Sequence, residues 1–148
     1  MTMNEMGARA KTAARALANA GALKESALLH AAGALRQRRE ELLAANALDV
    51  QAGREAGMSQ ALLDRLSLTE ARIQDMAAAV EEVAKSADPV GKTLSGQRLP
   101  NGLQLEKVTV PLGVIGIIYE ARPNVTSDAA ALCLKAGNAV ILRGGKEA

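Results

Sequence analysis

In the first part of the chain, apolar positions recur at helical spacing among good helix formers. We expect helices from residue 1 to about 86, including one from about residue 25 past residue 48 and a short one over 60–66. Asp88-Pro89 should close the last helix, because proline disfavours helix at the preceding residue. Thr69 can cap that helix, and its apolar stripe consists of Ile73, Met76, Ala77, Val80 and Val83.

The pattern changes at Pro89. From residue 90 to 110, glycine, threonine, glutamine and valine replace the alanine-rich sequence. Pro100-Asn101-Gly102 is a turn signal, since asparagine and glycine tolerate positive φ angles. Apolar and polar residues alternate after it. We therefore predict a β-hairpin with its turn at Asn101-Gly102.

The last part has a strand–helix–strand pattern. Residues 114–119 form a continuous apolar run, as expected for a buried parallel strand. Thr126 or Ser127 can cap the following helix, with Asp128 in its first turn. Residues 139–142 form a second strand. One such unit does not make a stable parallel sheet by itself, so we expect further strands C-terminal to this chain.

Composition narrows the function classes. Apolar residues make up 49% and charged residues 23%, which is ordinary for a globular protein. One tyrosine is the only aromatic residue, so the stacking platforms of single-strand nucleic-acid binding are missing. The net charge of +2 gives no reason to expect nucleic acid or a membrane surface as partner. With no signal-peptide pattern and no apolar run near the ~20 residues that span a bilayer, we expect a cytoplasmic protein.

Cysteine and histidine offer little chemistry. Cys133 lies inside the predicted helix between two leucines, where a buried and inert thiol is the default. A single cysteine excludes an internal disulfide. A single histidine gives no support to a metal site or a histidine-based triad, and we expect no metal.

The most informative loop spans residues 120–126, between the predicted strand and the helix. Ligands of open α/β sheets bind at that place. Arg122 supplies a planar cation beside a helix N-terminus that attracts anions, and Asn124 can donate to a developing oxyanion. Residues 143–145 (Arg-Gly-Gly) follow the second strand at the same edge. From the residues alone, an ordinary polar loop and a glycine turn with solvated charges remain the alternative.

Several segments together resemble one family. They are PNGL at 100–103, VPLGVIGIIYEARPNVTSDAAALCLKAGNAVILRGGKEA at 110–148, LLDRLSLTEARI at 62–73 and DPVG at 88–91. The stretches IYEARPNVT and LCLKAGNAVILRGG are the most specific. In these segments the chain resembles the N-terminal part of the gamma-glutamyl phosphate reductases (glutamate-5-semialdehyde dehydrogenases).

The resemblance implies an α/β fold of the aldehyde dehydrogenase type. Residues 1–88 would be the N-terminal helical part of the nucleotide-binding domain, and 89–110 the hairpin of an oligomerisation arm. Residues 111–148 would be the first strand–helix–strand of the nucleotide-binding domain, cut short. The parent enzyme is expected to be a homo-oligomer. Its catalytic cysteine lies in a later domain and Cys133 matches a helix cysteine, so we expect this chain to be inactive alone.

The resemblance also implies a reaction in proline biosynthesis. NADPH reduces L-glutamyl 5-phosphate to L-glutamate 5-semialdehyde, and phosphate is released. Carried over by position, Arg122 and Asn124 would bind the substrate, with Asn124 as candidate oxyanion donor. The cofactor-binding residues would be Ile118, Tyr119, Glu120, Ala121, Arg143, Gly144, Gly145 and Lys146.

Two other functions remain open. The chain could be a non-catalytic helical interaction module, truncated from an enzyme. It could also belong to another aldehyde dehydrogenase relative that oxidises a free aldehyde. The stretch IYEARPNVT argues against the second, and the absence of a helix after the last predicted strand argues for truncation over an evolved module.

Overall fold

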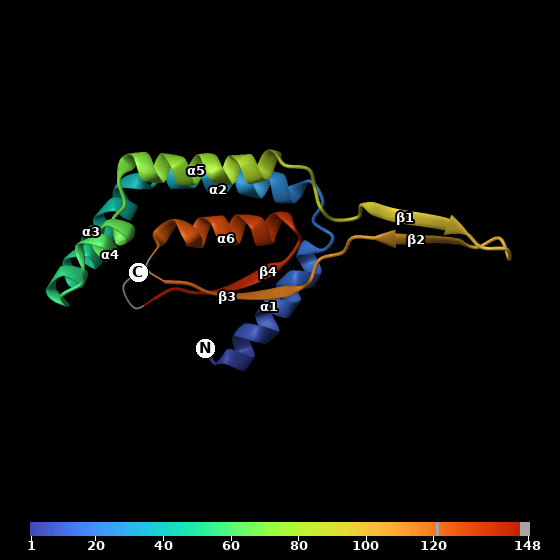
Figure 1. Cartoon of the computed structure of the whole chain (residues 1–148), viewed down its shortest axis with the longest axis horizontal. Coiled ribbons are helices and arrows are strands. Elements are labelled where there is room, and N and C mark those ends of the chain that lie inside the picture. Colours follow the sequence, from blue (N-terminus) through green and yellow to red (C-terminus); the bar gives the residue numbers. More distant parts are fainter. Residues whose placement is uncertain (121, 146–148) are drawn as a thin grey trace.

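A computed structural model describes residues 1–120 and 122–145 (Figure 1). Its first half is helical, with α1 Met3–Leu17, α2 Leu23–Gln37, α3 Arg39–Glu55, α4 Gln60–Leu66 and α5 Glu70–Lys85. A hairpin and a strand–helix–strand unit follow, with β1 Thr93–Arg98, β2 Gln104–Val108, β3 Val114–Ile118, α6 Pro123–Lys135 and β4 Ala139–Arg143. The α/β class predicted from the sequence is confirmed. None of the helices in the described ranges combines the length and apolarity needed to cross a membrane.

The long helix expected from residue 25 past residue 48 is wrong as a single element. It breaks at Arg38, whose backbone leaves the helical region at φ −100° and ψ 21°. The two halves pack in different places: α2 lies against α5, whereas α3 lies against α4. Each half has its own apolar cluster, and one straight helix could not serve both.

The other helical predictions are confirmed. The short helix occupies Gln60–Leu66, and the Thr69 side chain caps α5 by accepting from the Arg72 N–H at 3.1 Å. In α5 the predicted stripe faces inward, with Ile73, Met76, Ala77 and Val80 buried.

The start of α6 differs from the prediction. The helix begins at Pro123, with Arg122 as N-cap, so Thr126 and Ser127 lie inside it and cap nothing. Asp128 accordingly lies beyond the first turn. Proline at the first helical position is favourable, because its φ angle is already helical and its missing N–H would have had no partner there.

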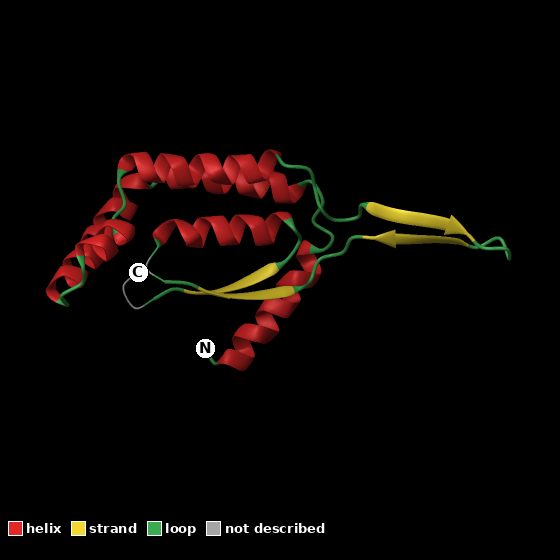
Figure 2. Ribbon diagram, viewed as in Figure 1, coloured by secondary structure: helices red, strands yellow, loops and turns green. Residues whose placement is uncertain are grey.

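The hairpin projects from the rest of the molecule (Figure 2). Its strands pair antiparallel, and the turn lies where the sequence predicts it: the Gly102 N–H donates to the Leu99 carbonyl at 2.9 Å. Gly102 has a φ angle of +89°, which a side chain would strain. All residues of β1 and β2 are exposed.

The strands β3 and β4 pair in parallel between α6 and α1 (Figure 1). The pair α2 and α5 forms a further layer over α6. The prediction that residues 114–119 are buried is wrong, since only every second residue of β3 is even partly covered. The physical reason is that both covering helices contact mainly β4, so β3 is the less covered strand of this two-stranded sheet.

The main core is built from alanines where three helices meet. Leu28 and Ala32 of α2, Ala77, Val80 and Ala84 of α5, and Ala131 of α6 form one cluster. Small side chains allow the helix backbones to approach closely. This contact fixes α6, and with it the two strands on its other side.

Polar anchors join the ends of these helices. The Lys135 ammonium group at the end of α6 donates to the Ala84 carbonyl at 2.7 Å, near the end of α5. Lys24, at the start of α2 and only 3% exposed, pairs with Asp88 at 2.8 Å. Both buried ammonium groups are therefore satisfied, which offsets their desolvation.

The close packing of alanines predicts how substitutions in α5 change the free energy of unfolding. Replacing Ala77, which is completely buried, by leucine (Ala77→Leu) should lower the free energy of unfolding by about 1–3 kcal/mol, because the helices cannot approach over the added carbons. Ala78→Leu, one position along on the exposed face of α5, is the control and should change it by less than about 0.5 kcal/mol. Urea unfolding followed by circular dichroism measures both. Equal effects of the two variants would contradict the packing described.

Candidate functional site

The predicted cofactor residues that the structure describes meet at one edge of the sheet. In the parallel register Ile118 lies opposite Arg143, and the Tyr119 N–H donates to the Arg143 carbonyl at 3.1 Å. Both strands therefore end together, as the sequence predicts. The Ile118 side chain is 83% exposed, and Arg143 is exposed beside it. Glu120 follows Tyr119 and is also exposed, while Gly144 and Gly145 continue from Arg143.

Two of the predicted cofactor residues, Ala121 and Lys146, lie outside the described residues. Tyr119 uses its side chain within the fold: its hydroxyl forms a hydrogen bond of 2.6 Å with the Thr126 hydroxyl of α6. This bond connects the end of β3 to the helix that follows it.

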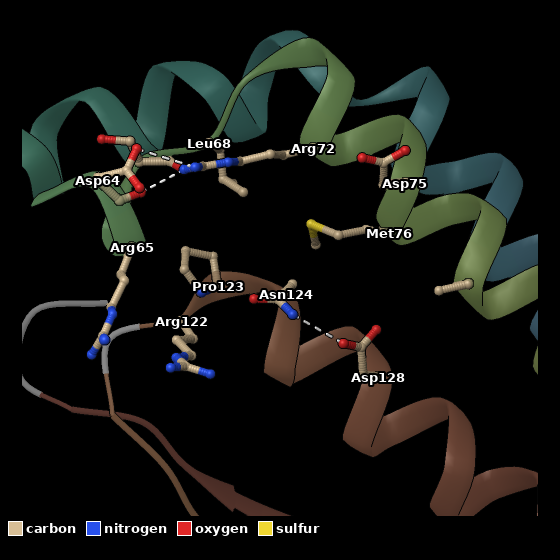
Figure 3. Close-up of a pocket in the computed structure, with 12 residues that line it drawn as sticks. Asp64, Arg65, Leu68, Arg72, Asp75, Met76, Arg122, Pro123, Asn124 and Asp128 are labelled. Atoms are coloured by element: carbon tan, nitrogen blue, oxygen red, sulfur yellow. Dashed lines mark hydrogen bonds and ion pairs between the residues drawn. The ribbon is translucent and has the colours of Figure 1, made fainter. Parts of the chain in front are cut away.

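The predicted substrate residues lie elsewhere, in a cleft between α6 and the α4–α5 corner (Figure 3). The cleft has a volume of about 420 Å³. Arg122, Pro123, Asn124 and Asp128 line it from the α6 side. The opposite wall comes from α4, α5 and their connection, and includes Asp64, Arg65, Ser67, Leu68, Arg72, Asp75, Met76 and Ala79.

Arg72 holds the corner of α4 and α5 together. Its guanidinium group donates to the Ser67 carbonyl at 2.6 Å, to the Asp64 carbonyl, and to the Asp64 carboxylate at 3.1 Å. The connection is also fixed from behind. Asn46 of α3 donates to the Leu66 carbonyl at 2.8 Å and accepts from the Leu68 N–H at 2.6 Å. The position of this wall of the cleft is thus fixed by hydrogen bonds from both Arg72 and Asn46.

On the α6 side, Asn124 lies in the first helical turn and not in a loop as expected. Its amide donates to the Asp128 carboxylate at 3.1 Å, which leaves the second amide hydrogen for another acceptor. Pro123 has no N–H, and the Val125 N–H donates to the Arg122 carbonyl at 3.0 Å. The N-terminus of α6 therefore offers few free backbone N–H groups. Binding of an anion at this place would depend mainly on side-chain donors.

The structure thus separates the predicted site into two places, because none of the described residues at the sheet edge lines the cleft. Sequence reasoning missed the far wall, namely Arg65, Arg72 and Asp75. The only signal was the stretch LLDRLSLTEARI, which includes the first two but assigns them no role. Within the described ranges, no group of three histidine, cysteine or acidic side chains could hold a metal ion.

Known proteins with closely similar sequences share one name. A gamma-glutamyl phosphate reductase of Moorella thermoacetica is 63% identical over 143 residues, which cover 96% of this chain and 34% of the relative. One of Syntrophomonas wolfei is 55% identical over 97% of this chain and 35% of the relative. No protein-family model matches the chain. The chain spans about a third of the length of these relatives.

Over nearly its whole length, the chain is closely similar to the N-terminal third of gamma-glutamyl phosphate reductases. Solved structures agree. The gamma-glutamyl phosphate reductase of Thermotoga maritima, 42% identical, superposes with a TM-score of 0.94 over 97% of this chain and 35% of its own. That of Saccharomyces cerevisiae gives 0.92 at 35% identity, over 99% of this chain and 38% of its own.

A Bacillus subtilis protein described as an aldehyde dehydrogenase has a similar fold at low sequence identity. It superposes with a TM-score of 0.62 over 93% of this chain and 28% of its own, at only 18% identity. At that identity it supports the fold alone. The predicted aldehyde dehydrogenase-like fold is therefore confirmed, and the resemblance to the reductases stated from the motifs is confirmed by sequence and structure.

The one cysteine of the chain is not placed for nucleophilic chemistry. Cys133 is 5% exposed inside α6 and is not among the residues that line the cleft. Burial raises the pKa of its thiol above the ordinary value, so the reactive thiolate is disfavoured. The prediction of a buried cysteine is confirmed, and its inertness stays a prediction.

The burial of Cys133 can be measured with a thiol reagent. At pH 8 the native chain should react with Ellman's reagent at least about a hundredfold more slowly than the urea-unfolded chain, because reaction requires local opening of α6. The control is the double variant Cys133→Ala, Leu132→Cys, which moves the thiol one position to a side chain that is 59% exposed. It should react rapidly when folded. Rapid reaction of native Cys133 would show that the thiol is accessible.

Proposed function

We propose that this chain is part of an enzyme that reduces L-glutamyl 5-phosphate with NADPH, giving L-glutamate 5-semialdehyde, phosphate and NADP⁺ in proline biosynthesis. The observation that carries the proposal is the 63% and 55% identity to named reductases over nearly the whole chain. In this proposal the chain supplies the sheet edge and both described walls of the cleft. The reaction also requires a nucleophile, and the buried Cys133 does not suit that role.

The sheet edge fits a dinucleotide. Two parallel strands end together there, Arg143 is exposed and can face a phosphate, and Gly144 and Gly145 place no side chain between backbone and ligand. Ile118 offers an exposed apolar surface at the same edge. Bound NADPH would supply the hydride. The assignment of Tyr119, Glu120, Ala121 and Lys146 to the cofactor site stays a prediction.

The cleft fits the substrate. Arg122 is exposed in it and carries the charge that a phosphate or carboxylate requires. Asn124 keeps one amide hydrogen beyond its bond to Asp128, so it can donate to the acyl oxygen as negative charge develops there. We further propose that the chain alone is inactive and that the working enzyme is cytoplasmic.

A chimeric enzyme tests the proposed function. In it, this chain replaces the matching 143 residues of the Moorella thermoacetica reductase. The chimera should keep kcat/KM for NADPH-dependent reduction within about tenfold of the parent, because the exchanged residues are mostly identical. This chain alone, in the same assay, should give no turnover. A chimera that is folded by circular dichroism but inactive would refute the proposal, as would activity of the chain by itself.

The hairpin suits assembly of the parent enzyme into a homo-oligomer. It projects from the helices, both of its outer edges expose unpaired backbone groups, and Leu94, Leu103, Leu105 and Val108 are exposed along it (Figure 1). Such an edge pairs readily with a strand of another chain. We therefore propose that residues 89–110 act as an oligomerisation arm.

Light scattering on the chimera checks the arm. Leu105→Lys should lower the mass of the assembly, because it places a charge on an apolar side chain that a partner would bury. Glu106→Lys, on the opposite face of the same strand, is the control and should leave the mass unchanged. An unchanged mass in the Leu105 variant would place the interface elsewhere.

A further inference from the structure

The cleft between α6 and the α4–α5 corner carries charges of both signs. Six of its lining residues are charged: Asp64, Arg65, Arg72, Asp75, Arg122 and Asp128. Its volume of about 420 Å³ is in the range of sites for small molecules. A site with both signs differs from a plain phosphate site, where the aspartates would repel the ligand.

Half of these charges are already engaged within the fold. Arg72 and Asp64 bind each other, and Asp128 accepts from Asn124. The others are Arg65, Asp75 and Arg122. Within residues 1–120 and 122–145, their side chains form no hydrogen bond or ion pair. Their charges are therefore available to a ligand.

The available charges are segregated in the cleft. Figure 3 shows Arg65 and Arg122 on one side, and Asp75 on the other side with Asp128, with Asn124 between the two groups. The cations come from α4 and the N-cap of α6, and Asp75 comes from α5. A cavity with this polarity is complementary to a small zwitterion, whose carboxylate and ammonium group meet opposite charges.

We propose that this cleft binds the α-amino acid head of the substrate. Arg65 and Arg122 contact the α-carboxylate, and Asp75 contacts the α-ammonium group. Asp128, oriented by Asn124, adds negative potential near the ammonium group. The assignment rests on the proposed function, and it makes Arg65 and Asp75 specificity-determining residues of that reaction. A substrate without the amino group leaves Asp75 without a partner and is disfavoured.

The experiment measures the chimera in the oxidative direction, with NADP⁺ and phosphate, on three aldehydes. L-glutamate 5-semialdehyde has both head groups, 5-oxopentanoate lacks the ammonium group, and pentanal lacks both. Asp75→Asn should lower kcat/KM for the semialdehyde by about 10- to 100-fold and leave the other two unchanged. Arg65→Gln should lower it for the semialdehyde and for 5-oxopentanoate, but not for pentanal.

The control is Glu82→Gln, which removes a carboxylate from an exposed position of the same helix outside the cleft, and it should change none of the three values. Equal losses on all three aldehydes, or no loss on the semialdehyde, in either cleft variant would overturn the assignment while leaving the proposed function intact. A folded chimera that oxidises none of the aldehydes would overturn the proposed function, and the assignment with it. Asp75 and Arg65 are exposed, so neither change removes a core contact.

Discussion

The alanine contact between α2, α5 and α6 determines where everything else lies. At Ala32, Ala77 and Ala131 the helices meet through side chains of a single carbon, so their backbones lie close and their relative positions are well defined. Because α6 is connected to β3 and β4, the same contact places the sheet. Because its first turn faces the α4–α5 corner, it also forms the cleft. A chain almost without aromatic residues suits this arrangement, since a core of small side chains needs none.

Polar anchors stabilise the arrangement at both ends of α6. At its end, Lys135 binds the Ala84 carbonyl, and Asn138 accepts from the Gly113 N–H at 2.8 Å just before β3. At its start, the Tyr119–Thr126 bond joins strand and helix. The chain reverses at Gly137, whose φ angle is +73° and where a Cβ would lie 2.8 Å from the Pro111 side chain. Glycine is required there for both reasons.

The fold and the side chains of the cleft carry different information about function. The aldehyde dehydrogenase-type fold is shared with a Bacillus subtilis protein at only 18% identity, so the fold alone does not select a substrate. The named reductases are far more similar to the chain in sequence. Substrate choice therefore depends on side chains that the fold positions, and we propose that in this chain these include the opposite charges of the cleft. The exposed sheet edge and the charged cleft are the two places where this segment, about a third the length of its relatives, presents candidate binding residues.

The sequence by itself determined the local elements and the relationship to the reductases. The cap at Thr69, the stripe of α5 and the turn at Asn101-Gly102 all follow from neighbouring residues, because capping, periodicity and turn geometry act over a few positions. The common end of β3 and β4 follows from the strand–helix–strand pattern, because such a unit pairs its two strands in parallel. Only the tertiary structure decided the break at Arg38 and the exposure of β3, since both depend on which surfaces pack together. Only the tertiary structure also showed that Asp75 and Arg122 line the same cleft. They are distant in sequence, and the packing of α6 on α5 brings them to one cleft.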